Sequence, residues 1–117
     1  LYYNGTGWVK RNGPTMRWDV GAAGSSNYTF TGPGFASATN DPVLYLMRGH
    51  TYIFVNGTGS SHPFEFRVSN GGAEYSSGVS GSKTGTQVLE VPMDAPSTLY
   101  YQCTIHSAMG NTINIVS

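Results

Sequence analysis

Short runs of apolar residues that alternate with polar ones recur along the chain, and Gly, Ser, Asn and Pro separate these runs. Residues 64–68, which read Phe-Glu-Phe-Arg-Val, show the alternation clearly. A period of two is typical of a strand with one buried face, and no segment sustains the 3.6-residue period of an amphipathic helix. The pattern predicts strands at residues 8–10, 17–20, 28–31, 43–47, 52–56, 64–69, 86–91, 99–103 and 112–116.

Strands of this length bury their apolar faces when two sheets pack face to face, so we predict an all-β fold. A polar, Gly/Ser-rich stretch at residues 70–85 is expected to be a long mobile loop inside one domain of residues 1–117. Residues 43–117 form the expected core. Residues 1–40 supply N-terminal strands that either complete the sandwich or belong to a linker or hairpin of a larger chain. An Asn-Gly turn at residues 4–5, between aromatic arms, predicts a hairpin.

Composition agrees with a β-sandwich and removes several function classes. A chain of 117 residues buries a core without disulfides, and charged residues make up only 10%, against about 25% in typical domains. Six basic and six acidic side chains give no net charge, so nothing favours a nucleic-acid partner, and no membrane segment is expected. The acidic residues are scattered without a spacing that would pair two carboxylates. We therefore predict no catalytic residues and no enzyme.

Three residues with soft or nitrogen donors follow one another at three-residue steps. Cys103 ends the predicted strand 99–103, and His106 and Met109 follow it before the predicted strand 112–116. With 3 His and 4 Met in 117 residues, this spacing after the single Cys arises by chance less than about once in a thousand. Thiolate and thioether donors favour copper, whereas zinc would use Cys and His but gain little from Met. A buried Cys that acts as a small apolar side chain is the alternative reading.

A copper site of this kind needs a second imidazole. We expect it from His62, which follows a turn-rich stretch and precedes the predicted strand 64–69, so that strand pairing could bring it to Cys103. His50, at the start of strand 52–56, is the less attractive candidate because a lone His there is usually a turn or surface residue.

The order of these segments resembles the cupredoxin family over residues 43–117. The run Gly-His-Thr-Tyr-Ile-Phe-Val-Asn at 49–56, then His62, then residues 88–92, and then residues 99–103 with the Cys-x-x-His-x-x-Met loop carry the resemblance. It implies a cupredoxin-like Greek-key β-sandwich of two packed sheets. It also implies one copper ion in a type 1 site, with His62, Cys103 and His106 as equatorial ligands, Met109 as the weak axial ligand, and a redox partner.

One position departs from the family pattern. The residue after the first His ligand is usually Asn in the family, and its backbone N–H donates to the thiolate sulfur. Here it is Pro63, which has no N–H. Because hydrogen bonds around the ligands tune a metal site, we expect an altered reduction potential or weaker copper retention.

A second resemblance concerns the first half of the chain. Residues 1–9 resemble segments of phage tail and appendage proteins. Residues 26–34, followed by residues 41–49, resemble cupredoxin-like modules in structural proteins of marine cyanobacterial viruses. This resemblance implies a module of a larger virion protein, with virion or surface-protein subunits as partners and a virion-surface or extracellular location. The alternative is a free-standing blue copper electron-transfer protein. Since a fold does not dictate its function, an empty or vestigial ligand set also stays open.

Overall fold

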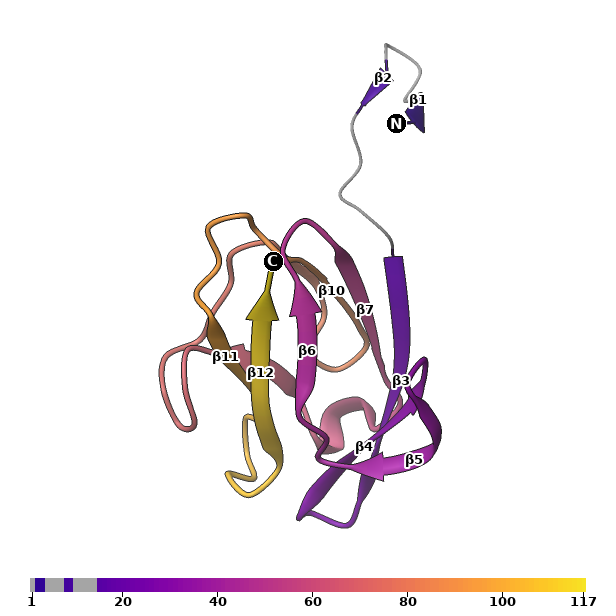
Figure 1. Ribbon diagram of the computed structural model, residues 1–117. Coiled ribbons are helices and arrows are strands. Elements are labelled where there is room, and N and C mark those ends of the chain that lie inside the picture. Colours follow the sequence, from indigo (N-terminus) through magenta and orange to yellow (C-terminus); the bar gives the residue numbers. More distant parts are fainter. Residues whose placement is uncertain (1, 4–7, 10–14) are drawn as a thin grey trace.

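The computed structural model describes residues 2–3, 8–9 and 15–117 (Figure 1). Strands β1 (Tyr2–Tyr3) and β2 (Trp8–Val9) pair antiparallel and form a two-stranded sheet of their own. Tyr3 lies opposite Trp8, as the predicted hairpin requires, while the Asn-Gly turn itself lies outside the described residues. Within the described ranges, no helix is long and apolar enough to cross a bilayer.

The larger sheet has six strands. Their order across the sheet is β5 (Phe35–Asn40), β4 (Asn27–Gly32), β3 (Thr15–Ala23), β7 (Thr51–Asn56), β10 (Thr86–Glu90) and β9 (Val79–Gly81). Strands β3 and β7 run parallel, and the other neighbours run antiparallel. Residues 15–40 therefore complete this sheet and are part of the sandwich.

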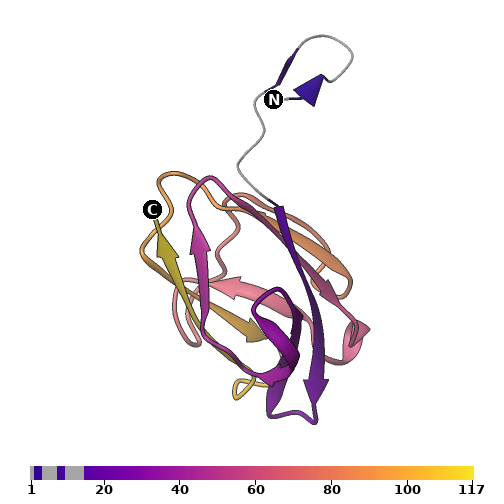
Figure 2. The same ribbon diagram turned by 45° about the vertical axis from the view of Figure 1, so that its right-hand side comes forward.

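The second sheet has four strands and carries the segments around the predicted metal ligands. Their order is β6 (Leu44–Met47), β12 (Gly110–Val116), β11 (Thr98–Cys103) and β8 (Phe64–Arg67). Strands β6 and β12 are parallel, and a short 3-10 helix, η1 (Gly59–Ser61), precedes β8. The chain crosses repeatedly between the two sheets, which face each other in both views (Figure 2). The predicted all-β fold, a sandwich of two packed sheets with Greek-key crossings, is confirmed.

The sequence pattern did not predict two strands of the six-stranded sheet, β5 and β9. Strand β5 has only Phe35 as a large apolar residue. Strand β9 has only Val79, and its backbone pairs with β10. Backbone pairing of this kind needs no alternation of side chains, so the pattern contained no signal for it. The prediction of a loop over all of residues 70–85 is therefore wrong at residues 79–81.

Aromatic side chains fill much of the space between the sheets. Trp18 stacks on Tyr52 with ring centroids 5.6 Å apart, and Phe54 meets Phe64 of the opposite sheet at 5.4 Å. All four side chains are at most 5% exposed. Trp18 and Phe54 alternate with more exposed neighbours along their strands, as the period of two predicts. Toward the end of the sandwich that carries His106, the packing continues through Tyr28, whose side chain is fully buried.

Candidate metal centre

Strand pairing places His62 beside the only cysteine. In the antiparallel pair β8–β11, Phe64 at the start of β8 lies opposite Cys103 at the end of β11. His62 is two residues before Phe64, where η1 ends, so it reaches the same end of the sheet as Cys103. The expectation that a strand pair brings His62 to Cys103 is confirmed.

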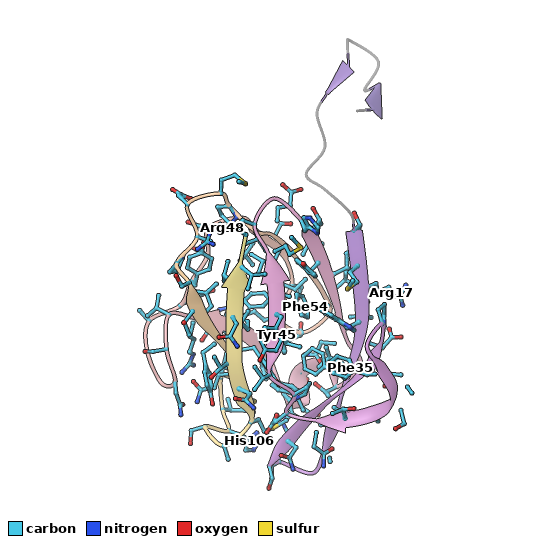
Figure 3. The ribbon with its side chains drawn as sticks, in the orientation of Figure 1. Arg17, Phe35, Tyr45, Arg48, Phe54 and His106 are labelled. Carbon is cyan, nitrogen blue, oxygen red and sulfur yellow. The ribbon has the colours of Figure 1, made fainter. Side chains whose placement is uncertain are left out.

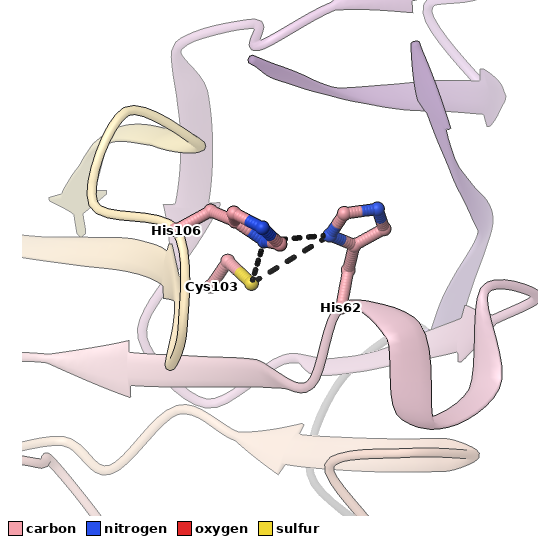
Figure 4. Close-up of side chains that lie close together, drawn as sticks. All are labelled: His62, Cys103 and His106. Carbon is pink, nitrogen blue, oxygen red and sulfur yellow. Dashed lines mark hydrogen bonds between the residues drawn. The ribbon is translucent and has the colours of Figure 1, made fainter. Parts of the chain in front are cut away.

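The donor atoms of His62, Cys103 and His106 form a compact triangle (Figure 4). The two Nδ1 atoms lie 3.1 Å apart, and Cys103 Sγ lies 3.6 Å from Nδ1 of His106 and 3.9 Å from Nδ1 of His62. The two imidazole nitrogens are thus within hydrogen-bond distance of each other, and both rings contact the sulfur. Three side chains from two segments of the chain thus converge on one point.

This triangle has the size that a metal ion requires. The point equidistant from the three donor atoms is about 2.1 Å from each, close to the 2.0–2.3 Å over which imidazole nitrogen and thiolate sulfur bind a divalent ion. Two imidazoles and one thiolate in a trigonal arrangement are the donor set of a type 1 copper site. The site is therefore capable of binding copper.

The three side chains differ in exposure in a way that suits a held ion. Cys103 is 1% exposed, whereas His62 and His106 are half-buried. His106 lies at the end of the sandwich away from the C-terminus (Figure 3). The sulfur is therefore shielded from water, and the two imidazoles are the more exposed donors.

Backbone hydrogen bonds close the segment from Cys103 to Met109, which we call the ligand loop. The Cys103 N–H donates to the Met109 carbonyl at 3.0 Å, and the Met109 N–H donates to the His106 carbonyl at 3.1 Å. The Met109 side chain is fully buried in the core. Its predicted role as axial ligand stays a prediction.

The backbone of His62 and Pro63 is held by buried polar side chains that the sequence reasoning did not single out. The His62 carbonyl accepts from Asn56 Nδ2 at 2.8 Å and from the Tyr28 hydroxyl at 2.9 Å, and that hydroxyl also reaches the Pro63 carbonyl at 2.9 Å. The Thr104 N–H donates to the Pro63 carbonyl at 3.1 Å, which joins the ligand loop to the His62 segment. The only sequence signal for a special role of Asn56 was its position at the end of a predicted strand, just before a turn.

Pro63 offers no N–H to the sulfur, as expected. Among the residues that the structure describes, the hydrogen-bond partners of Cys103 Sγ are the two imidazoles. Burial, and next the neighbouring Cys103, raise the pKa of the Tyr28 hydroxyl far above its ordinary value, so Tyr28 stays a neutral donor.

Asp41 supports the other end of the ligand loop and was also missed. Its carboxylate accepts from the N–H groups of Tyr28 at 2.8 Å and Gly110 at 3.2 Å, in a left-handed backbone conformation with φ of 38°. Burial raises the pKa of this carboxyl, against the opposing effect of the two hydrogen bonds. His50, by contrast, lies in the turn between β6 and β7 and stacks on Tyr52, away from the triangle, as its lower ranking implied.

Comparisons with known proteins return solved structures alone. No family model matches the chain, and no curated protein matches it. A structure of reduced rusticyanin matches with 20% identity and a TM-score of 0.48, over 88% of this chain and 80% of that one. Rusticyanin from Thiobacillus ferrooxidans matches with 22% identity and a TM-score of 0.48, over 94% and 86%. Another, described as the copper protein rusticyanin, matches with 19% identity and a TM-score of 0.46, over 88% and 78%. At these values the resemblance does not assign a function to the chain.

Proposed function

We propose that this chain binds one copper ion in a type 1 site and passes single electrons. His62, Cys103 and His106 would hold the ion in the trigonal plane, and Met109 would be the weak axial ligand. The observation that carries the proposal is the triangle of donor atoms, whose edges of 3.1, 3.6 and 3.9 Å fit a metal ion.

The donor chemistry supports copper over zinc. A thiolate and a thioether are soft donors that suit copper, and a structural zinc site would want a fourth strong donor in a tetrahedral arrangement. Copper would supply a one-electron couple between Cu(II) and Cu(I). The protein's part is to hold the imidazoles and the thiolate in one arrangement and to keep water from the sulfur, which the burial of Cys103 supports.

Electron transfer requires a redox partner, and the half-buried His106 is the side chain that would lie between the ion and that partner. This proposal makes the chain an electron carrier and not a catalyst. The members of the family that the sequence resembles work in this way.

A finer proposal concerns the setting of the domain. The resemblance of residues 26–34 and 41–49 to modules of cyanophage structural proteins supports a place in a larger virion protein, at the virion surface or outside the cell, beside other virion or surface-protein subunits. A free-standing blue copper protein fits the same fold and triangle. The full-length chain decides between them, since a virion module is flanked by further domains and a free carrier is a monomer of this domain.

The copper proposal is tested by the absorption spectrum of the purified domain after addition of Cu(II). We expect an intense visible band from thiolate-to-copper charge transfer, and we expect its loss in the Cys103→Ser variant. A titration with Zn(II) beside it measures the competing metal. A wild-type protein that shows no such band, and whose stability copper leaves unchanged, would overturn the proposal and favour a structural role.

A further inference from the structure

Gln102, the residue before Cys103, has a side chain that is 1% exposed and fully hydrogen-bonded. Its Oε1 accepts from Arg67 Nη1 at 3.0 Å and from the Gly71 N–H at 2.8 Å. Its Nε2 donates to Asn70 Oδ1 at 3.1 Å and to the Ser107 carbonyl at 2.9 Å. A primary amide can donate two and accept two such bonds, so this one is satisfied completely.

The four partners belong to two regions that are distant in sequence. Arg67 ends β8, Asn70 and Gly71 lie in the turn that follows it, and Ser107 lies in the ligand loop. Ser107 is one residue past His106, while Gln102 is one residue before Cys103. The bond from Nε2 to the Ser107 carbonyl therefore fixes the parts of the chain that carry two of the three donors relative to each other.

An ion-pair cluster holds Arg67, which is one of the two donors to Gln102 Oε1. Glu65, which is 8% exposed, pairs with Arg67 Nε at 2.6 Å and with Lys83 Nζ at 2.8 Å, and Lys83 also meets Glu74 at 3.0 Å. Glu65 thus fixes the guanidinium of Arg67, which also donates to Gln102. Glu65 and Arg67 are largely buried, whereas Lys83 and Glu74 lie at the more exposed rim of the cluster. Satisfied polar groups in the buried part rigidify the structure around them.

We propose that Gln102 is a positioning residue of the metal centre. Through the Ser107 carbonyl it holds the ligand loop closed over Cys103, and through Arg67 it ties that loop to the ion-pair cluster of Glu65, Arg67, Lys83 and Glu74. The effect on bound metal rests on the proposed copper function, whereas the closure of the loop is a property of the metal-free chain.

The chain offers a matched control in Gln87. This glutamine is 3% exposed in β10, in the six-stranded sheet, and its Oε1 is buried without a hydrogen-bond partner. Replacing it with Met removes a buried amide of the same size that makes no hydrogen bond to the ligand loop. Gln87→Met therefore reports what the loss of a buried glutamine does in general.

The first test uses the metal-free protein and measures how fast the Cys103 thiol reacts with a small aromatic disulfide that releases a coloured thiolate. Gln102→Met removes all four hydrogen bonds at nearly constant volume. Gln102→Glu keeps the two acceptor bonds but loses the donor to Ser107. We expect both variants to react about fivefold faster or more, because opening of the ligand loop becomes easier, and Gln87→Met to stay within about twofold of wild type. Equal rates in all four proteins would overturn the proposal, and a folding failure of Gln102→Met would leave Gln102→Glu to decide.

The second test uses the copper-loaded protein. We expect the Gln102 variants to shift or weaken the thiolate-to-copper band and to lose copper to a chelator about fivefold faster or more, with the band of Gln87→Met unchanged. An identical band and identical loss of copper would contradict the proposed effect on the metal. If wild type itself shows no band, the copper function fails, and the thiol reaction rates still decide whether Gln102 closes the loop.

Discussion

At the scale of single residues, the ligand loop depends on a glycine at its exit. Gly110 has a φ of 144°, and a Cβ there would collide with the carbonyl of Tyr101 on the neighbouring strand. Only glycine meets both conditions, which explains its place directly after Met109. The spacing of Cys103, His106 and Met109 pointed to the loop, but nothing in that spacing assigned a role to Gly110.

We expect Gly110→Ala to lower the free energy of unfolding by at least about 2 kcal/mol, since it combines a strained backbone with a steric clash. Gly34→Ala is the matched control, because Gly34 also has a positive φ, 87°, but has nothing within 4 Å of the added Cβ. The control should cost about 1–2 kcal/mol. Urea denaturation measures both, and equal losses would show that the contact with Tyr101 is harmless.

The axial position of Met109 is a second residue-scale prediction and rests on the proposed copper site. Met109→Leu preserves volume, so the free energy of unfolding should change by less than about 1.5 kcal/mol. Loss of a thioether donor weakens Cu(II) binding more than Cu(I) binding, so the reduction potential should rise. The rise is about 59 mV for each tenfold loss of Cu(II) affinity relative to Cu(I) affinity. A redox titration checks this. An unchanged potential would exclude Met109 from the metal.

Residue-level prediction succeeded where the chemistry is local in sequence. Cys103 and His106 are three residues apart on one loop, and His62 is joined to them by a strand pair that alternation predicts. Tyr28 and Asp41 escaped notice because their contacts cross between segments that only the folded chain brings together. A buried tyrosine in an apolar run looks like any core residue until its hydroxyl has a partner.

At the scale of elements, strand β8 begins two residues after His62 of the metal centre and contains two members of the ion-pair cluster, Glu65 and Arg67. Glu65 lies on β8 between the buried Phe64 and Phe66. Burial opposes its ionisation, but the hydrogen bonds and charges of Lys83 and Arg67 outweigh burial and lower the pKa of its carboxyl below the ordinary 4.5. The cluster thereby fixes β8 to the segment around Lys83, which precedes β10.

This shift has a definite consequence for pH dependence. A carboxyl whose folded pKa is lowered contributes stability that is fully present above the ordinary pKa of 4.5 and is lost as the pH falls through the folded value. We therefore expect Glu65→Gln to be less stable than wild type at pH 7 and the difference to shrink below about pH 4. Urea unfolding between pH 3 and 7 measures the difference. Glu90→Gln, at an exposed position of β10, should stay within about 0.5 kcal/mol of wild type, and a gap for Glu65→Gln that does not change with pH would contradict the assignment.

The elements that were predicted correctly are those with an alternating apolar face, such as β7 and β11. Strands β5 and β9 are held by backbone pairing at the two edges of the six-stranded sheet, where few side chains are buried. Their pairing partners, β4 and β10, make them strands. A local pattern cannot contain that information.

At the scale of the whole molecule, the proposed metal centre joins segments that leave the sandwich at different points. His62 enters from the end of η1, and Cys103 and His106 enter from the loop between β11 and β12. An ion bound to all three would link β8 with the β11–β12 hairpin. Metal that binds only this folded arrangement stabilises the fold by mass action.

We expect copper at a thousandfold excess over its dissociation constant to raise the free energy of unfolding by about 4 kcal/mol. The melting temperature should rise accordingly with copper concentration. The Cys103→Ser variant should show little of this increase, because it lacks the thiolate. Calorimetry of both proteins across a copper series measures the effect, and parallel curves would argue that copper binds elsewhere.

The class of fold followed from alternation and composition, because both reflect burial of one strand face. The parallel pairs β3–β7 and β6–β12 did not, since nothing local distinguishes a parallel from an antiparallel neighbour. The final arrangement of the sheets is a property of contacts between distant residues such as Leu44 and Ile113.

Strand β12 is an inner strand of its sheet and comes late in the sequence. We expect both properties to affect when the donor triangle assembles. As the chain leaves the ribosome, β6 emerges early, yet its sheet partner β12 comes from residues 110–116. Pairings across such separations form slowly compared with local ones. Because the ligand loop directly precedes β12, we expect it to reach its final place in the sandwich only after β12 has paired with β6. Loading with metal would accordingly follow the synthesis and folding of this part of the chain.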